Sequence, residues 1–81
     1  SLIIYPNPSK HIFNIKLASL VNQDIQIRVF NSIGDEVYIE NLEKYIGEYS
    51  NIISLESYSK SFYFLEIKAN NEIIYKTLIL K

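Results

Sequence analysis

The stretch DIQIRVFNSIGDEVY constrains the fold more than any other part of the chain, because it contains a strand, a turn and a returning strand. Every second residue on both sides of the turn is apolar, which is the pattern of a half-buried strand. These residues are Ile25, Ile27, Val29, Val37 and Ile39. Asn31 suits the first position of a type I turn, and Gly34 can take the left-handed conformation that closes the turn with a bulge. The stretch predicts a β-hairpin whose hydrophobic face the rest of the chain must cover.

Further segments have the composition and alternation of strands. They are Leu2–Tyr5, His11–Leu17, Tyr49–Leu55, Ser61–Lys68 and Glu72–Leu80. Between strands, residues 21–24 predict a turn, residues 41–47 a loop with a short helical turn, and residues 56–60 a surface crossover. With the two strands of the first hairpin, this pattern predicts an all-β fold. The expected architecture is a seven-stranded antiparallel Ig-like β-sandwich with Greek-key connections.

The last two of these segments predict a second hairpin, because Asn70-Asn71 between them can supply the positive φ of a two-residue turn. The register that follows pairs Ala69 with Glu72, Ile67 with Ile74, Leu65 with Lys76 and Tyr63 with Leu78. One face then carries Tyr63, Leu65, Ile67, Ile74 and Leu78, and the other carries Phe62, Phe64, Tyr75 and Ile79. A strand with two apolar faces is either covered on both sides or presents a surface to a partner.

Length and charge exclude several classes of protein. The 81 residues predict one domain, residues 1–81, and a hydrophobic content of 48% supplies its core without any cysteine. Charges of both signs are scattered and sum to −1, which argues against a nucleic-acid partner and against an electrostatic membrane anchor. No apolar run approaches the roughly 20 residues that span a bilayer. Because the chain starts without Met or a signal peptide, we expect it to be part of a longer protein.

The sequence contains no catalytic or metal-binding constellation. His11 is the only histidine, so no metal site can use two imidazoles, and beside a turn it is expected to be a surface residue. Glu36, Glu40 and Glu48 are interpreted as solvated charges on strands or loops. A glycine-rich phosphate loop and a nucleophile elbow are both absent from the sequence. We therefore expect a protein that is not an enzyme and that uses no metal or other cofactor.

The seven tyrosines allow a different interpretation, since their rings could form a stacking platform for sugars. Tyrosine is also a common strand residue whose ring packs while its hydroxyl stays in water. An accessory β-sandwich module that binds a glycan or a surface protein therefore stays open as an alternative function.

A proline motif follows the first strand: Tyr5, Pro6, Asn7 and Pro8, with Ser9 and Lys10 next. Proline has no N–H to donate to a β-ladder, so this segment is expected on a sheet edge or between two strands. Proline also holds the residue before it in an extended conformation. A rigid kink beside the first strand is the simplest structural interpretation.

This motif, followed by the strand at Phe13, resembles the opening of the type IX secretion system C-terminal sorting domains (type A) of Bacteroidetes. The turn at Gly34, the aromatic strand at Tyr63 and the closing segment Lys76–Lys81 resemble that family's later motifs in the same order. The likeness extends over essentially the whole chain. Two positions differ, because His11 and Ser61 stand where the family commonly has glycine.

The resemblance implies a sorting signal without catalytic activity. Such domains lie at the C-terminus of a cargo protein that reaches the periplasm with an ordinary signal peptide. The expected partners are the outer-membrane translocon of the type IX system, a shuttle protein and a sortase-like protease that typically removes the domain. The cargo lies N-terminal to the domain, and it ends up secreted or on the cell surface.

The closing strand is the candidate for recognition by this machinery, because its edge could add to a partner's strand. The residues of this hypothesis are Lys76, Leu78, Ile79, Leu80 and Lys81. In the competing interpretation, Leu78 and Leu80 only close the core. An apolar terminal edge also favours dimerisation by strand exchange.

Overall fold

A computed structural model describes residues 2–70 and 72–81 of the chain. These residues form β1 (Leu2–Tyr5), β2 (Ile12–Phe30), β3 (Glu36–Ser54), β4 (Ser61–Ala69) and β5 (Glu72–Leu80). All neighbouring strands run antiparallel and belong to one hydrogen-bonded sheet. Within this part of the chain, no helix has the length and hydrophobicity that crossing a membrane requires. The predicted all-β antiparallel class is confirmed.

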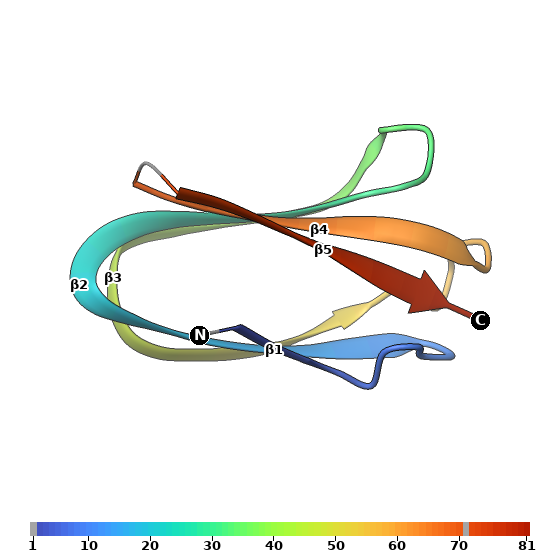
Figure 1. The fold of residues 1–81 in the computed structure, drawn as a ribbon, viewed down its shortest axis with the longest axis horizontal. Coiled ribbons are helices and arrows are strands. Elements are labelled where there is room, and N and C mark those ends of the chain that lie inside the picture. The colour runs from blue at the N-terminus through green and yellow to red at the C-terminus, as the bar shows by residue number, and fades with distance from the viewer. Residues whose placement is uncertain (1, 71) are drawn as a thin grey trace.

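The sheet folds back on itself through its two longest strands. β2 and β3 have 19 residues each, and they curve together at one end of the molecule (Figure 1). One layer contains β1, the first half of β2 and the second half of β3. The other layer contains the first half of β3, the second half of β2, β4 and β5. The core therefore lies between two halves of a single sheet.

The predicted count of seven strands is wrong, and neither a sandwich of separate sheets nor its Ig-like Greek key is confirmed. The predicted strands on either side of residues 21–24 are two halves of β2, and those on either side of residues 41–47 are two halves of β3. The predicted turn and loop are strand residues at the bend, and most of them are exposed. Their polar composition reflects exposure at the bend, not the end of a strand.

Positive φ angles and side-chain hydrogen bonds accommodate the bend. Lys44 and Gly47 in β3 have φ values of 48° and 102°. The ladder between β2 and β3 shifts its register on both sides of Gln23. Nearby, Asp24 Oδ1 accepts a hydrogen bond from Lys44 N at 2.8 Å, and Gln23 Nε2 donates to Ser19 Oγ at 2.8 Å. Side chains thus supply hydrogen bonds where the regular ladder is interrupted.

The turn of the first hairpin is confirmed. Gly34 N donates to Asn31 O at 3.0 Å, which puts Asn31 in the first position of the turn, and Gly34 has a φ of 90°. The Asn31 side chain adds to this, because its Oδ1 accepts from Ile33 N at 3.1 Å and from Asp35 N at 2.9 Å. Asparagine at this position therefore fixes the turn through both its backbone and its side chain.

The returning strand of this hairpin faces the core with different residues from those predicted. A register shift after Val29 pairs Val29 with Tyr38, which packs against the core, and Glu40 follows on the same face. Ile39 points outward and is 47% exposed, so its predicted place on the hydrophobic face is wrong, whereas Val37 is partly buried. A shift of one residue moves every side chain of a strand to the other face.

The second hairpin has the predicted register, from the pair Ala69–Glu72 to the pair Tyr63–Leu78. Asn70 has a φ of 51°, as a turn residue should, whereas the prediction for Asn71 lies outside the described residues. The predicted inner face is buried except for Ile74, which is 40% exposed. The outer face of β4 and β5 leaves large apolar side chains in water, namely Phe62, Phe64, Ile73 and Tyr75.

The core is formed by apolar side chains from both layers, and they contact one another between the two halves of the sheet. Its buried members are Phe13, Ile15, Ile25, Ile27, Val29, Tyr49, Ile53, Leu55, Tyr63, Leu65, Ile67, Leu78 and Leu80. Burying an aliphatic side chain of this size stabilises a fold by about 1.5–3 kcal/mol relative to leaving it exposed. Two members, Leu78 and Leu80, belong to the strand that the sequence singled out for recognition.

Candidate functional site

The proline motif and the end of β5 lie side by side. The chain leaves β1 at Tyr5, and residues 7–9 run along the outer edge of β5, on the side opposite β4. The proline motif was expected on a sheet edge, and this position confirms it. The two groups of residues that the sequence singled out at opposite ends of the chain therefore form one site.

The side chain of Asn7 pairs with the backbone of β5. Its Nδ2 donates to Thr77 O at 2.8 Å, and its Oδ1 accepts from Ile79 N at 2.9 Å. A carboxamide carries a donor and an acceptor in one plane, so it can occupy the two groups that a neighbouring strand would pair. Aspartate could not donate to the Thr77 carbonyl, and this chemistry accounts for asparagine between the two prolines.

Ser9 continues the same edge with its backbone. Ser9 N donates to Ile79 O at 2.8 Å, and Lys81 N donates to Ser9 O at 2.8 Å, which forms a parallel bridge next to Leu80. The Ser9 side chain is buried, and its Oγ donates to Ile12 O. The sequence reasoning did not identify Ser9 as a site residue; the only signal was a small residue directly after Pro8.

The five residues of the recognition hypothesis divide by burial. Lys76 and Lys81 are exposed and Ile79 is half-buried, whereas Leu78 and Leu80 are 0% and 2% exposed. Leu78 and Leu80 therefore belong to the core and fix the position of the strand. The other three side chains are the ones that a partner can contact while the domain stays folded.

The remaining motif residues have structural surroundings. Tyr5 is 43% exposed with the ammonium group of Lys16 5.7 Å from its ring centre. Both peptide bonds that precede Pro6 and Pro8 are cis. Gly34 serves the turn of the first hairpin, as described above. Tyr63 is buried, and its hydroxyl donates to Ser59 O at 2.6 Å, which ties the crossover 56–60 to β4.

His11 and Ser61, the two departures from the family pattern, sit in ordinary backbone. Neither has a positive φ, so neither position requires glycine. His11 is exposed, as expected, and its carbonyl accepts from Leu55 N at 2.9 Å. Ser61 begins β4 opposite Leu80. The substitutions therefore leave the local fold intact.

An open hollow of about 370 Å³ adjoins the site. Its lining is mostly apolar and includes the basic residues Lys10 and Lys81. The lining residues are Pro6, Pro8, Ser9, Lys10, His11, Ile12 and Lys81. The hollow brings Lys81 together with the proline motif on one surface.

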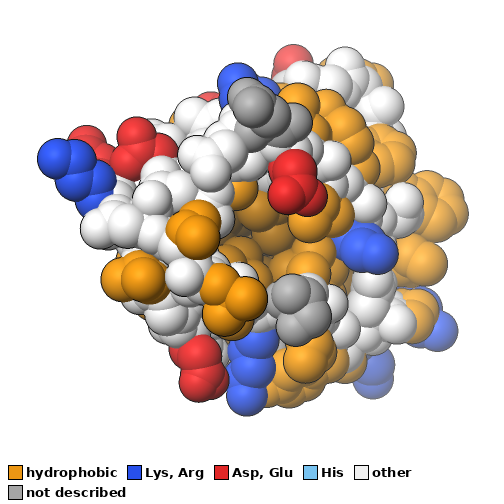
Figure 2. All heavy atoms as spheres, turned by 60° about the vertical axis from the view of Figure 1, so that its left-hand side comes forward, with side chains coloured by type: hydrophobic (Ala, Val, Ile, Leu, Met, Phe, Trp, Pro, Cys, Tyr) orange, Lys and Arg blue, Asp and Glu red, His pale blue; other side chains and the backbone are white. Residues whose placement is uncertain are grey.

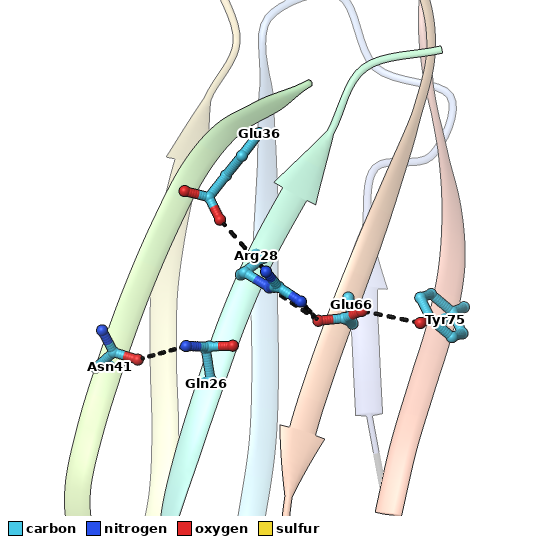
Figure 3. A network of polar contacts seen from close by, with 6 residues as sticks. All are labelled: Gln26, Arg28, Glu36, Asn41, Glu66 and Tyr75. Carbon is cyan, nitrogen blue, oxygen red and sulfur yellow. Dashed lines mark hydrogen bonds and ion pairs between the residues drawn. The ribbon is translucent and has the colours of Figure 1, made fainter. Parts of the chain in front are cut away.

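A polar network on the outer face ties β5 to β4 and β2 (Figure 3). Arg28 donates from Nε and Nη2 to Glu66 Oε1 at 2.9 and 2.6 Å, and Tyr75 donates its hydroxyl proton to Glu66 Oε2 at 2.9 Å. Glu36 lies 3.7 Å from the Arg28 guanidinium, and the guanidinium stacks over Phe30. Every strand of this layer contributes one member to the network.

The network explains how a carboxylate on an outer face can be 5% exposed. Burial raises the pKa of Glu66, but hydrogen bonds from Arg28 and Tyr75 outweigh burial and leave this pKa below its ordinary value. The same hydrogen bonds raise the pKa of Arg28 and the pKa of Tyr75. Both carboxylate oxygens of Glu66 therefore accept hydrogen bonds from side chains of the same protein.

Glu40 forms a second polar cluster at the edge where the two halves of β3 face each other. Its carboxylate accepts from Tyr38 at 2.9 Å, from Asn51 at 3.1 Å and from the hydroxyl of Tyr49. The interpretation of Glu40 as a solvated charge is wrong, because the register shift in β3 turns it inward. Glu36 and Glu48 are exposed, as predicted.

The cluster changes the acidity of its members. Burial raises the pKa of Glu40, but hydrogen bonds from Tyr49, Tyr38 and Asn51 outweigh it, so the pKa of Glu40 is lowered. Burial and the hydrogen bond to Glu40 raise the pKa of Tyr38 to about 12, and they raise the pKa of Tyr49 as well. Neither change points to proton transfer, since every group keeps the charge it has at neutral pH.

The tyrosines do not form a common sugar-stacking face. Tyr49 and Tyr63 are buried, and Tyr38 and Tyr45 are partly buried against the core. The three exposed rings lie on different elements: Tyr5 at the end of β1, Tyr58 in the crossover and Tyr75 on β5.

Comparison with known families identifies the family to which the chain belongs. The model of the secretion system C-terminal sorting domain matches residues 3–81. A comparison with curated proteins finds no match. The matched range includes the proline motif, the Gly34 turn, the aromatic strand and the closing strand, which the structure assembles into one sheet and one edge contact. The chain therefore belongs to the family of secretion system C-terminal sorting domains, the sorting signals of type IX secretion.

Proposed function

We propose that this domain is a non-catalytic, detachable address for a cargo protein attached at its N-terminal side. The outer-membrane translocon and a shuttle protein of the type IX system recognise the folded domain in the periplasm. A sortase-like protease then removes it, and the cargo is released or held at the cell surface. The observation that carries this proposal is the family match over residues 3–81.

The geometry supports a sorting signal that a partner recognises in its folded state. Asn7 and Ser9 hold the last residues of β5, while Leu78 and Leu80 anchor this strand in the core. The strand therefore keeps one conformation, which spares a partner the cost of ordering it. We propose that the partner reads the side chains of Lys76, Ile79 and Lys81 on this strand.

The polar clusters support a role without turnover. The carboxylates of Glu40 and Glu66 accept hydrogen bonds from neighbouring side chains of the same fold. Among the described residues, no three His, Cys, Asp or Glu side chains come together as a metal site would require. Both clusters stabilise the sheet in this proposal, and neither binds a substrate.

The test of the address is localisation of a reporter. Residues 1–81 are fused behind a signal peptide and a fluorescent protein and expressed in a bacterium with a type IX system. We expect the reporter at the surface or in the medium with an intact translocon, and in the periplasm without the translocon. A reporter that stays periplasmic in both strains, on a folded domain, would overturn the proposal and make sugar binding the next test.

Matched sets of substitutions test whether a partner recognises the side chains of Lys76, Ile79 and Lys81. One variant carries Lys76→Ala, Ile79→Ser and Lys81→Ala, and its control carries Lys16→Ala, Ile52→Ser and Lys44→Ala elsewhere on the surface. We expect the first variant to lose export while its melting temperature stays near that of the control. Equal export by the two variants would show that these side chains are not read.

A further inference from the structure

β5 is an edge strand whose outer edge is only partly covered. The backbone of the proline segment and the side chain of Asn7 occupy its outward groups from the Thr77 carbonyl onward. Because backbone groups facing one side of a strand recur at every second residue, those of Ile73 and Tyr75 face the same side. Within residues 2–70 and 72–81, no hydrogen bond uses the outward groups of Ile73 or Tyr75.

The side chains beside this open edge are apolar and exposed. Ile73, Ile74 and Tyr75 are 51%, 40% and 62% exposed, with Glu72 and Lys76 exposed on either side of them. A hollow of about 220 Å³ between the layers, lined in part by Ile74, adds further apolar surface (Figure 2). An edge of this kind is a template for another strand.

We propose that the strand that occupies this edge is β5 of a second copy of the chain. Two copies related by a two-fold axis pair antiparallel, with Ile74 opposite the same residue of the other copy. Ile73 of each copy then lies opposite Tyr75 of the other, and Glu72 lies opposite Lys76 of the other. Each dimer gains two ion pairs and two aliphatic–aromatic pairs, both of which stabilise antiparallel strands.

The charges select this register. Only a shift by two residues keeps the outward backbone groups paired. Such a shift in either direction puts Ile74 opposite Glu72 or opposite Lys76, and a second shift of the same size puts Lys76 opposite itself. None of these alternatives pairs the two opposite charges. The pairs of the selected register lie between Glu72 and Lys76, before the part of the edge where Asn7 binds Thr77.

This dimer differs from one formed by strand exchange, because each copy keeps its own β5 paired with β4. It also goes beyond the sorting function, which needs only one copy. Pairing joins the four-stranded layers of two copies into one continuous sheet, with both Asn7 contacts still in place. The Asn7 contact thereby limits the pairing to the short stretch between Glu72 and Lys76.

Charge reversal tests the register through the association constant of the 81-residue chain, measured by sedimentation equilibrium. Glu72→Lys or Lys76→Glu alone replaces two attractive pairs per dimer by two repulsive ones, and we expect about a tenfold weaker dimer. The double variant restores opposite charges and should recover the wild-type constant. Glu56→Lys and Lys10→Glu, at exposed positions outside the Glu72–Lys76 stretch, are the matched controls.

A cysteine provides a second measurement that does not depend on charge. The chain has no cysteine of its own, so Ile74→Cys introduces one thiol per copy. Residues in a non-hydrogen-bonded antiparallel pair have Cα atoms about 4.5 Å apart, within the range for a disulfide. We expect Ile74→Cys to form a covalent dimer under mild oxidation much faster than Ile52→Cys. Single reversals that associate like the wild type, or equal oxidation of the two cysteine variants, would overturn the proposal.

Discussion

Ile79 donates its backbone N–H to the side chain of Asn7 at 2.9 Å, although the two residues are 72 positions apart in the chain. The same carboxamide donates to the carbonyl of Thr77 at 2.8 Å. A single side chain near one end of the domain thus completes the strand at the other end. The most informative motif of the sequence and the candidate recognition strand depend on each other structurally.

Replacing Asn7 with alanine removes both hydrogen bonds. Each contributes about 0.5–1.5 kcal/mol net, so we expect the free energy of unfolding to fall by about 1–3 kcal/mol. Urea denaturation measures this loss, and amide hydrogen exchange at Ile79 localises it. Asn22→Ala, at an exposed position in β2, is the control. If the Ile79 amide exchanged no faster in Asn7→Ala than in the control, the contact would not hold this edge.

The hydroxyl of Tyr49 donates a hydrogen bond in the polar cluster around Glu40. Its removal should weaken the edge where the two halves of β3 face each other. Hydrogen bonds to a charged group are worth about 1.5–3 kcal/mol, and we expect Tyr49→Phe to destabilise the domain by about that amount. Tyr5→Phe is the matched control, because the Tyr5 hydroxyl makes no hydrogen bond within the described residues. Similar midpoints of urea denaturation for both variants would contradict the role of this cluster.

The same cluster predicts a loss of stability in alkali. The pKa of Tyr38 rises from 10.0 to about 12 in the folded protein. A group whose pKa is raised by folding stabilises the fold below its unfolded pKa, and this contribution disappears as pH rises through the folded value. Stability should therefore fall between pH 10.0 and about 12. The tyrosinate absorbance should develop in two phases, and Glu40→Gln should move the later phase to lower pH.

Local patterns in the sequence predicted the hairpins well. The Asn31–Gly34 turn and the register from Ala69–Glu72 to Tyr63–Leu78 are confirmed because turn chemistry and period-2 alternation act over neighbouring residues. The bend at Lys44 and Gly47 could not be predicted in this way. Polar, exposed residues inside a long strand have the composition of a loop, and only the pairing of β2 with β3 identifies them as strand.

The inward position of Glu40 was missed for a related reason. One register shift after Val29 changes which residues of β3 face the core, and alternation alone cannot reveal such a shift. The contact between Asn7 and β5 was out of reach of any local pattern, because it joins segments at opposite ends of the chain. The missing N–H of proline predicted only that this segment lies on a sheet edge or between two strands, without naming the strand.

Glu66 provides the last prediction, which concerns acid. Its pKa is lowered from 4.5 in the folded protein, and a carboxylate with a lowered pKa stabilises the fold at pH values above its unfolded pKa. That contribution disappears as pH falls through the folded value, when the proton displaces the hydrogen bonds from Arg28 and Tyr75. The free energy of unfolding should therefore hold steady towards pH 4.5 and then decrease.

Glu66→Gln separates this group from the other carboxylates. At neutral pH the variant should be less stable than the wild type by about 1–3 kcal/mol. Glutamine keeps one accepting oxygen but loses the charge, and its NH2 group cannot accept in place of the second carboxylate oxygen. Below the folded pKa the wild-type carboxyl is also neutral, so the two proteins should converge. Glu56→Gln, in the exposed crossover, should follow the wild type throughout. A constant difference between Glu66→Gln and the wild type at every pH would mean that the shape of the side chain matters, and its charge does not.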